Sequence, residues 1–105
     1  MVRSDLTAHN PWLSERAVTW PTEIWAETAD GKSRTQGWVL LPPKLLVNER
    51  VPAILFIHGG PNGFAGTAMD LEYHLLAAEG YAVIWCNPRG SSGYGRDRGD
   101  MELAY

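Results

Sequence analysis

Several features that direct a chain to a particular function are scarce or missing in these 105 residues. No apolar run approaches the roughly 20 residues that a membrane-spanning helix needs, so no membrane partner is expected. The first residues carry Arg3 and Asp5 without the apolar stretch of a signal peptide, which favours a cytoplasmic location. The one cysteine, Cys86, excludes an internal disulfide framework and argues against a zinc cluster. Its apolar neighbours predict a buried side chain.

An excess of basic residues is also absent. Nine Lys and Arg face twelve Asp and Glu, for a formal net charge of -3, and no basic stripe is present. The composition therefore argues against a nucleic-acid partner. With 45% hydrophobic and 20% charged residues, the chain is typical of one small globular domain or of a piece of a larger one. The five tryptophans indicate a core or an interface.

The apolar pattern first predicts a β-hairpin. Residues 1–21 lack periodicity and contain Asn10-Pro11 and Trp20-Pro21, which indicates an irregular segment. Residues 22–28 alternate in polarity as a strand does, and Asp30-Gly31 then predicts a tight turn, because glycine accepts a positive φ. Residues 35–41 read as the returning strand, which ends at two prolines.

A strand–helix–strand unit follows the hairpin. The five apolar residues from Ala53 to Ile57 suit a strand buried on both faces, and residues 81–86 read as a second buried strand. Residues 67–79 between them have a helical pattern with Gly80 as the C′ residue. We expect Thr67 to cap this helix with Asp70 in an approximate capping box. The apolar stripe expected to face the core comprises Leu71, Leu75, Leu76 and Ala78. The two strands should be parallel with a right-handed crossover, which makes the chain α/β.

The first strand of this unit ends abruptly in His58-Gly59-Gly60-Pro61. Open α/β sheets bind ligands at the carboxyl ends of their strands. A backbone without Cβ atoms can turn tightly there and present bare N–H groups to a ligand oxygen. An HGG-type loop after a hydrolase strand supplies one half of an oxyanion hole. The alternative is a tight turn that needs glycine for steric reasons alone.

Four stretches together resemble the prolyl oligopeptidase family of serine peptidases, in particular its dipeptidyl aminopeptidase/acylaminoacyl-peptidase branch. They cover roughly residues 22–95. The stretches are Ala29-Asp30-Gly31 with Gln36-Gly37-Trp38, residues 52–61 with the HGGP motif, Glu79-Gly80-Tyr81-Ala82-Val83, and Asn87-Pro88-Arg89-Gly90-Ser91-Ser92-Gly93-Tyr94-Gly95. The resemblance implies a partial α/β-hydrolase fold, made of an N-terminal hairpin plus one βαβ unit of a mostly parallel sheet. Residues 1–21 are similar to the linker from that family's β-propeller.

The family places its nucleophile in a G-x-S-x-G elbow and uses a Ser-Asp-His triad in that chain order. Ser91 and Ser92 each have a glycine on one side only, and the three other serines have none. The three histidines, His9, His58 and His74, precede any place that the triad histidine occupies. Residues 22–105 are therefore expected to be the N-terminal part of a catalytic domain, truncated before the nucleophile. The chain alone should be inactive and should self-associate.

The resemblance also implies roles for individual residues. The backbone N–H groups of Gly60 and Gly59 would face the substrate oxyanion, and His58 would shape the loop by hydrogen bonding. Asn62, Gly63 and Phe64 are candidates for the substrate entrance, where a peptide or acyl-peptide would bind in the intact enzyme. No metal or organic cofactor is implied. Arg89 is expected to tie loops together, with binding of a substrate carboxylate as the alternative. The alternating charges from Arg96 to Asp100 indicate a solvated surface.

Two other function classes compete with the peptidase interpretation. A dinucleotide-binding loop would need G-x-G-x-x-G, but Arg98 stands where the third glycine after Gly93 and Gly95 belongs. No P-loop lysine follows a glycine cluster. A non-catalytic α/β interaction module stays open, because an oxyanion loop without a nucleophile catalyses nothing.

Overall fold

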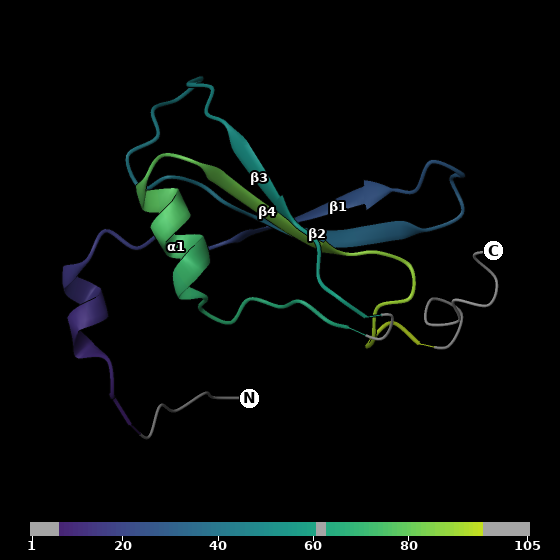
Figure 1. Ribbon diagram of the computed structural model, residues 1–105, viewed down its shortest axis with the longest axis horizontal. Coiled ribbons are helices and arrows are strands. Elements are labelled where there is room, and N and C mark those ends of the chain that lie inside the picture. The colour runs from purple at the N-terminus through teal and green to yellow at the C-terminus, as the bar shows by residue number, and fades with distance from the viewer. Residues whose placement is uncertain (1–6, 61–62, 96–105) are drawn as a thin grey trace.

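The computed structural model describes residues 7–60 and 63–95. It contains one short 3-10 helix, one α-helix and four strands, which Figure 1 shows as a sheet with the α-helix packed against it. In chain order the elements are η1 (Pro11–Glu15), β1 (Thr22–Glu27), β2 (Arg34–Leu40), β3 (Ala53–Phe56), α1 (Leu71–Ala78) and β4 (Ala82–Asn87).

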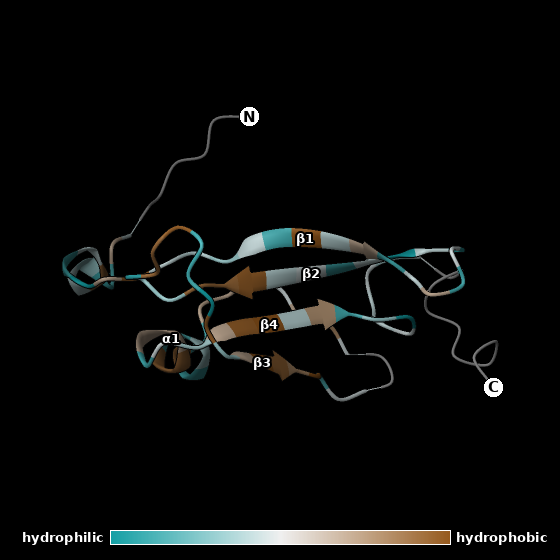
Figure 2. Cartoon of the chain, turned by 90° about the horizontal axis from the view of Figure 1, so that it is seen from above, coloured by the Kyte–Doolittle hydropathy of each residue, from teal (hydrophilic) through white to brown (hydrophobic). Residues whose placement is uncertain are grey.

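The four strands form one sheet in the order β1-β2-β4-β3, which can be followed in Figure 2. The predicted hairpin is confirmed, since β1 and β2 pair antiparallel and Gly31 in the turn has φ of 66°. The predicted parallel pairing of β3 with β4 is also confirmed. The hairpin joins this unit through an antiparallel pairing of β2 with β4, so the sheet is mixed.

The core lies between α1 and one face of the sheet. Trp38 on β2 stacks on Trp85 on β4, with ring centroids 6.2 Å apart. The Tyr73 ring of α1 lies 4.8 Å from Trp85 and 4.5 Å from Phe56 on β3. Burial is the main reason that the pKa of Tyr73 is raised, and the neighbouring carboxylates add to it. Two of the five tryptophans thus build the core that joins the helix to three strands.

The helix begins later than predicted. Asp70, and not Thr67, is the N-cap residue, and its side chain accepts a hydrogen bond of 2.9 Å from the Glu72 N–H. The expected C-terminus is confirmed, because Gly80 has φ of 96° and its N–H donates to the Ala77 carbonyl. The Tyr81 N–H donates to the Leu76 carbonyl, which completes a Schellman motif.

The predicted apolar stripe of α1 is wrong in most of its members. Leu71 and Leu75 are 64% and 58% exposed, and Ala78 is exposed as well. The side facing the sheet carries Tyr73, Leu76 and Ala77. The reason is the Tyr73 ring, whose contacts with Trp85 and Phe56 turn its own face, with Leu76 and Ala77 three and four residues on, toward the sheet.

The prediction that β3 is buried on both faces is also wrong for the described residues. Its burial alternates between exposed and half-buried, and Leu55 is 56% exposed. The physical reason is its place at the sheet edge, with β4 on one side and α1 on one face only. Cys86, on the same open face as Leu55, is half-buried and not buried as predicted.

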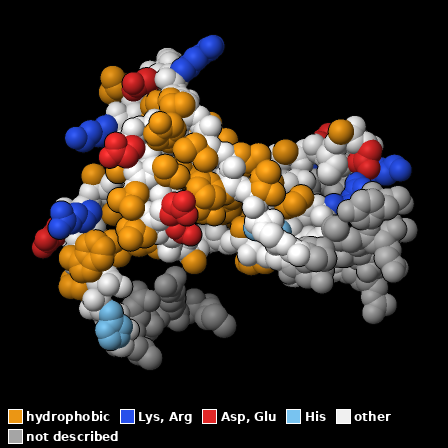
Figure 3. Space-filling model, viewed as in Figure 1, with side chains coloured by type: hydrophobic (Ala, Val, Ile, Leu, Met, Phe, Trp, Pro, Cys, Tyr) orange, Lys and Arg blue, Asp and Glu red, His pale blue; other side chains and the backbone are white. Residues whose placement is uncertain are grey.

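An apolar edge strand is a template for pairing with another chain. We expect the isolated 105-residue chain to self-associate through β3, where the Leu55 side chain is exposed and Ile57, directly after the strand, is exposed as well. Figure 3 shows how widely hydrophobic side chains gather on one face. Light scattering after size exclusion should give a mass above that of the monomer.

Leu55→Lys tests this expectation, because a lysine on an edge strand opposes pairing, and Leu46→Lys is its matched control. Leu55→Lys should shift the chain toward monomer, whereas Leu46→Lys, at a side chain 73% exposed outside the sheet, should not. A sharp monomer peak for the unchanged chain would contradict the expectation.

Candidate active site

Two loops meet at one end of the strands. Because β3 and β4 are parallel, the segment after Phe56 and the segment after Asn87 leave the sheet at the same end. Figure 1 shows both segments running out from that end and coming together beyond the strands. We call residues 57–70 the β3 loop and residues 88–95 the β4 loop. The HGGP motif lies in the β3 loop, at the end of the sheet where α/β proteins bind ligands.

His58 is hydrogen-bonded on both sides of its ring. Its Nδ1 lies 2.9 Å from the carbonyl oxygen of Gly59. Its Nε2 lies 3.1 Å from the hydroxyl oxygen of Ser91, a residue that is 2% exposed. His58 therefore links the start of the β3 loop to a buried hydroxyl in the β4 loop.

The contact with Gly59 also sets the direction of the following N–H group. A trans peptide is planar, with its C=O and N–H pointing in opposite directions. Since the Gly59 carbonyl points at the His58 ring, the Gly60 N–H points away from that ring. Both glycines are exposed. Gly59 has no positive φ, and a Cβ built on it would meet no atom within 4 Å.

Gly63 has a clear steric requirement for glycine. A Cβ at this position would lie 2.2 Å from the Gly59 carbonyl oxygen and 2.5 Å from His58 Nδ1. The Gly63 carbonyl accepts a hydrogen bond of 3.0 Å from the Ser92 N–H, which is a second link to the β4 loop. Phe64 is 60% exposed, and its ring lies beside Gly66 and Gly93.

Asn87, the last residue of β4, holds the middle of the β3 loop. It is 3% exposed. Its side-chain oxygen accepts from the Ala65 N–H and its side-chain NH₂ donates to the Ala65 carbonyl, both at 2.8 Å. Trp85 Nε1 donates to the Gly66 carbonyl at 2.9 Å. Two inward side chains of one strand thus fix two successive residues of the loop.

Further polar contacts connect the β4 loop to the hairpin. The NH₂ of Asn87 also donates to the Tyr94 hydroxyl at 2.7 Å, and that hydroxyl donates to the Gln36 side chain of β2. Arg89 forms an ion pair of 3.0 Å with Asp30 in the hairpin turn. The expected role of Arg89 in tying loops together is confirmed by this contact.

The pKa of Asp30 is held well below its usual range. The largest cause is the hydrogen bond from the Thr28 hydroxyl, followed by the Lys32 N–H and Arg89. A carboxyl whose pKa is lowered by folding stabilises the fold above its unfolded pKa, and this contribution is lost as the pH falls. The Arg89 contact is therefore intact at neutral pH.

The sequence-predicted residues fall into three groups. The structure places His58, Gly59 and Gly63 in mutual contact, with Gly60 and Phe64 exposed nearby. Asn62 and the charged run from Arg96 lie outside the described residues.

Asn87 and the partner role of Ser91 were not predicted. The signal for Asn87 was a polar residue at the inward position after Val83 and Trp85, where burial demands hydrogen-bond partners.

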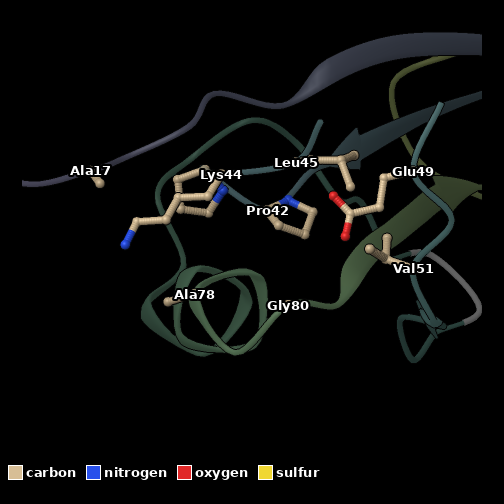
Figure 4. Close-up of a pocket in the computed structure, with 9 residues that line it drawn as sticks. Ala17, Pro42, Lys44, Leu45, Glu49, Val51, Ala78 and Gly80 are labelled. Carbon is tan, nitrogen blue, oxygen red and sulfur yellow. The ribbon is translucent and has the colours of Figure 1, made fainter. Parts of the chain in front are cut away.

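A separate hollow of about 510 Å³ lies at the opposite end of β3 and β4. It is lined by Ala17, by residues 42–45, and by Glu49, Val51, Ala78 and Gly80, several of which Figure 4 shows between α1 and the β2–β3 connection. Its position at the amino ends of the parallel strands separates it from the HGGP loop.

In the described part of the chain, no group of His, Cys, Asp and Glu is placed to hold a metal ion. Across the same residues, no helix has the length and hydrophobicity to cross a bilayer.

Curated relatives and solved structures with similar chains are peptidases. The uncharacterized peptidase YuxL of Bacillus subtilis is 40% identical over 90 residues, which are 86% of this chain and 14% of the relative. Dipeptidyl-peptidase 5 of Porphyromonas gingivalis is 34% identical over 94 residues, 87% of this chain and 14% of the relative. A Pyrococcus horikoshii acylaminoacyl peptidase superposes with a TM-score of 0.79 at 32% identity, covering 90% of this chain and 15% of that one. No family model matches.

The resemblance to the prolyl oligopeptidase family is confirmed. So is the fold class, because the structural neighbours are α/β-hydrolase peptidases and the mixed sheet with one helix is consistent with part of that fold. The chain spans about 14% of the length of these curated relatives. Among the solved neighbours is an acylaminoacyl peptidase in complex with Z-Gly-Gly-Phe-chloromethyl ketone, with a TM-score of 0.76 at 31% identity, 90% of this chain and 15% of that one.

Gly63 and Gly59 make a matched pair for testing the loop's packing. Gly63→Ala should destabilise the protein by about 1–3 kcal/mol, as overpacking does, because the methyl group would collide with the Gly59 carbonyl and the His58 ring. Gly59→Ala should change stability by less than about 0.5 kcal/mol, since its Cβ would meet no atom. Denaturant unfolding followed by tryptophan fluorescence measures both. Equal effects would show that the packing around His58 is not tight.

Proposed function

We propose that this chain supplies the oxyanion loop of a serine peptidase that acts on peptide or acyl-peptide substrates. The Gly60 N–H is the donor to the developing oxyanion. Gly59, which has no side chain, leaves the space beside this N–H open to the substrate. The observation that carries the proposal is the Gly59–Gly60 peptide at the carboxyl edge of β3, whose carbonyl is held by His58 while its N–H points away. Gly59 supports it as well, because it is a glycine with no steric need to be one.

The relatives support the reaction class. They are named peptidases, dipeptidyl-peptidases and acylaminoacyl peptidases, and one of the latter was solved with a peptide chloromethyl ketone. In the intact enzyme a serine attacks the substrate carbonyl, a histidine takes the serine proton, and an aspartate orients that histidine. These groups lie in the part of the enzyme beyond this chain. The oxyanion then accepts from the Gly60 N–H and from the N–H of the residue after the serine.

The segment before β1 fits a connection into this catalytic domain, and we propose the same division as for the family: residues 1–21 as a linker from a β-propeller and residues 22–105 as catalytic domain. The Thr19 hydroxyl donates to the Leu41 carbonyl at 2.8 Å, and the Thr19 carbonyl lies 3.3 Å from His74 Nε2. These contacts fasten the segment to the residue after β2 and to α1, at the end of the sheet away from the HGGP loop.

Gly60→Val in the full-length enzyme tests the oxyanion assignment. The branched side chain would crowd the position of the oxyanion, so kcat should fall about 10²-fold or more, as for loss of an oxyanion-hole donor. The melting temperature should change little, because Gly60 is exposed. Steady-state kinetics with a chromogenic peptide substrate give the answer. An unchanged kcat would assign the glycines to turn formation only.

The 105-residue chain by itself should hydrolyse nothing, because none of its five serines stands in a G-x-S-x-G elbow. A fluorophosphonate probe should therefore leave the chain unlabelled, as judged by intact mass. Ser91 is the informative residue, since it lies beside His58 but is 2% exposed. Stoichiometric labelling of Ser91 would overturn the assignment of the nucleophile to another part of the enzyme.

A further inference from the structure

We propose that the exposed ring of Phe64 is a wall of the substrate site and that it selects peptides with a large apolar side chain next to the scissile bond. The proposal rests on the oxyanion assignment of Gly60 and adds a specificity-determining residue and a substrate class to it. Among the residues expected at the substrate entrance, Asn62 lies outside the described residues and Gly63 has no side chain. Phe64 is the one whose side chain faces solvent.

Phe64 branches from the backbone beside the glycine pair. A Cβ at Gly63 would lie 2.2 Å from the Gly59 carbonyl oxygen, so the backbone of Gly63 lies against the Gly59–Gly60 peptide. Consecutive Cα atoms are about 3.8 Å apart. Phe64 is therefore one residue away from the contact with the peptide whose N–H we assign to the oxyanion.

The backbone on both sides of Phe64 is fixed by β4 and its loop. The Gly63 carbonyl accepts a hydrogen bond from the Ser92 N–H, and both backbone groups of Ala65 are bonded to the Asn87 side chain. Ala65 itself packs against the core. A turn of the Phe64 ring into the core would require this backbone to rotate and these bonds to break. The fold therefore holds the ring outward.

The ring is seated between two glycines. A Cβ at Gly66 would lie 3.1 Å from the ring Cε1 atom, and one at Gly93 would lie 3.8 Å from Cδ2, on the opposite edge of the ring. Gly66 has no positive φ, so the nearby ring, and not the backbone conformation, accounts for the absence of a side chain there. Phe64 is thus held at two edges while 60% of the residue stays exposed.

The chemistry around the ring favours an apolar ligand. Residues 63–66 and Gly93 contribute no charged or polar side chain. A charged group placed here would lose hydration without gaining a partner, whereas an apolar group gains free energy by leaving water. An aromatic side chain on a fixed backbone also loses little conformational entropy when it binds. The ring is therefore suited to contact an apolar side chain of a peptide.

Another part of the catalytic domain is the competing occupant of this surface, since the chain spans about 14% of the length of its curated relatives. The two occupants differ in what a substitution changes. A ring packed inside the domain contributes to stability and affects all substrates alike. A ring in contact with the substrate changes the enzyme's preference among substrates.

Phe64→Ala in the full-length enzyme separates these cases. The substrates are pairs of internally quenched peptides that differ only in Leu or Ala at one residue, first on the amino side of the scissile bond and then on the carboxyl side. At one of these two positions, kcat/KM for the Leu peptide should fall about 10-fold or more, while that for the Ala peptide stays within about twofold. The effect should be confined to one position, because a single ring lies to one side of the bond.

Phe64→Leu keeps an apolar side chain and should preserve more of the preference for Leu than Phe64→Ala does. It also keeps the test decisive if Phe64→Ala does not fold. Leu46→Ala is the matched control, because Leu46 is 73% exposed and lies outside the sheet in the β2–β3 connection. It should leave the ratio of the two kcat/KM values unchanged. Melting temperatures are measured for all three variants.

The outcomes distinguish this inference from the function on which it rests. If Gly60→Val lowers kcat while Phe64→Ala leaves the Leu-to-Ala ratio unchanged at both positions, the specificity role is wrong and the oxyanion assignment stands. If Gly60→Val leaves kcat unchanged, the oxyanion assignment itself is wrong. An equal loss for all peptides in Phe64→Ala, together with a lower melting temperature, would assign the ring to packing within the domain and overturn its role in substrate selection.

Discussion

The arrangement of the site depends on the pairing of Asn87 with Ala65. A buried amide is costly unless it is hydrogen-bonded, and a buried backbone N–H or C=O is costly for the same reason. The Asn87 side chain satisfies both backbone groups of Ala65, and Ala65 satisfies both ends of the amide. The Asn87 side chain therefore bonds the N–H and the C=O of a loop residue in the way that a neighbouring strand bonds the backbone of a strand residue. Removing its side chain would take away the hydrogen-bond partners of both backbone groups of Ala65, a half-buried residue.

From this pairing the other contacts follow in sequence. With Ala65 fixed, the β3 loop returns past the end of β4, where Gly63 meets the Ser92 N–H. That return brings Gly63 against His58 and leaves room for the imidazole only because Gly63 has no side chain. Ser91 then lies at the far side of the ring. A polar residue at the end of an apolar strand thus determines how a glycine pair some distance along the chain is presented.

The sequence was informative wherever the pattern was local. Asp30-Gly31 and the Gly80 terminus could be read from neighbouring residues, because turn chemistry acts over a few positions. The parallel pairing of β3 with β4 followed from the strand–helix–strand order of their segment. The pairing of β2 with β4 could not, since it joins segments far apart in the chain and is selected by the stacking of Trp38 on Trp85. Within the site, His58 and the glycines stood out as a motif. Its partners Ser91 and Asn87 did not, because their roles depend on which loops the sheet brings together.

The place of β3 in the sheet also constrains how the proposed site is completed. One N–H group is half of an oxyanion hole, and the side of the HGGP loop toward β4 is already occupied by the β4 loop. If Gly60 is the donor, the second donor and the nucleophile must approach from the other side, where β3 has an unpaired edge among the described residues. The strand edge through which we expect the isolated chain to associate is then the edge along which we propose that the rest of the catalytic domain pairs. On this proposal, one segment of the catalytic domain both pairs with the open edge of β3 and carries the nucleophilic serine.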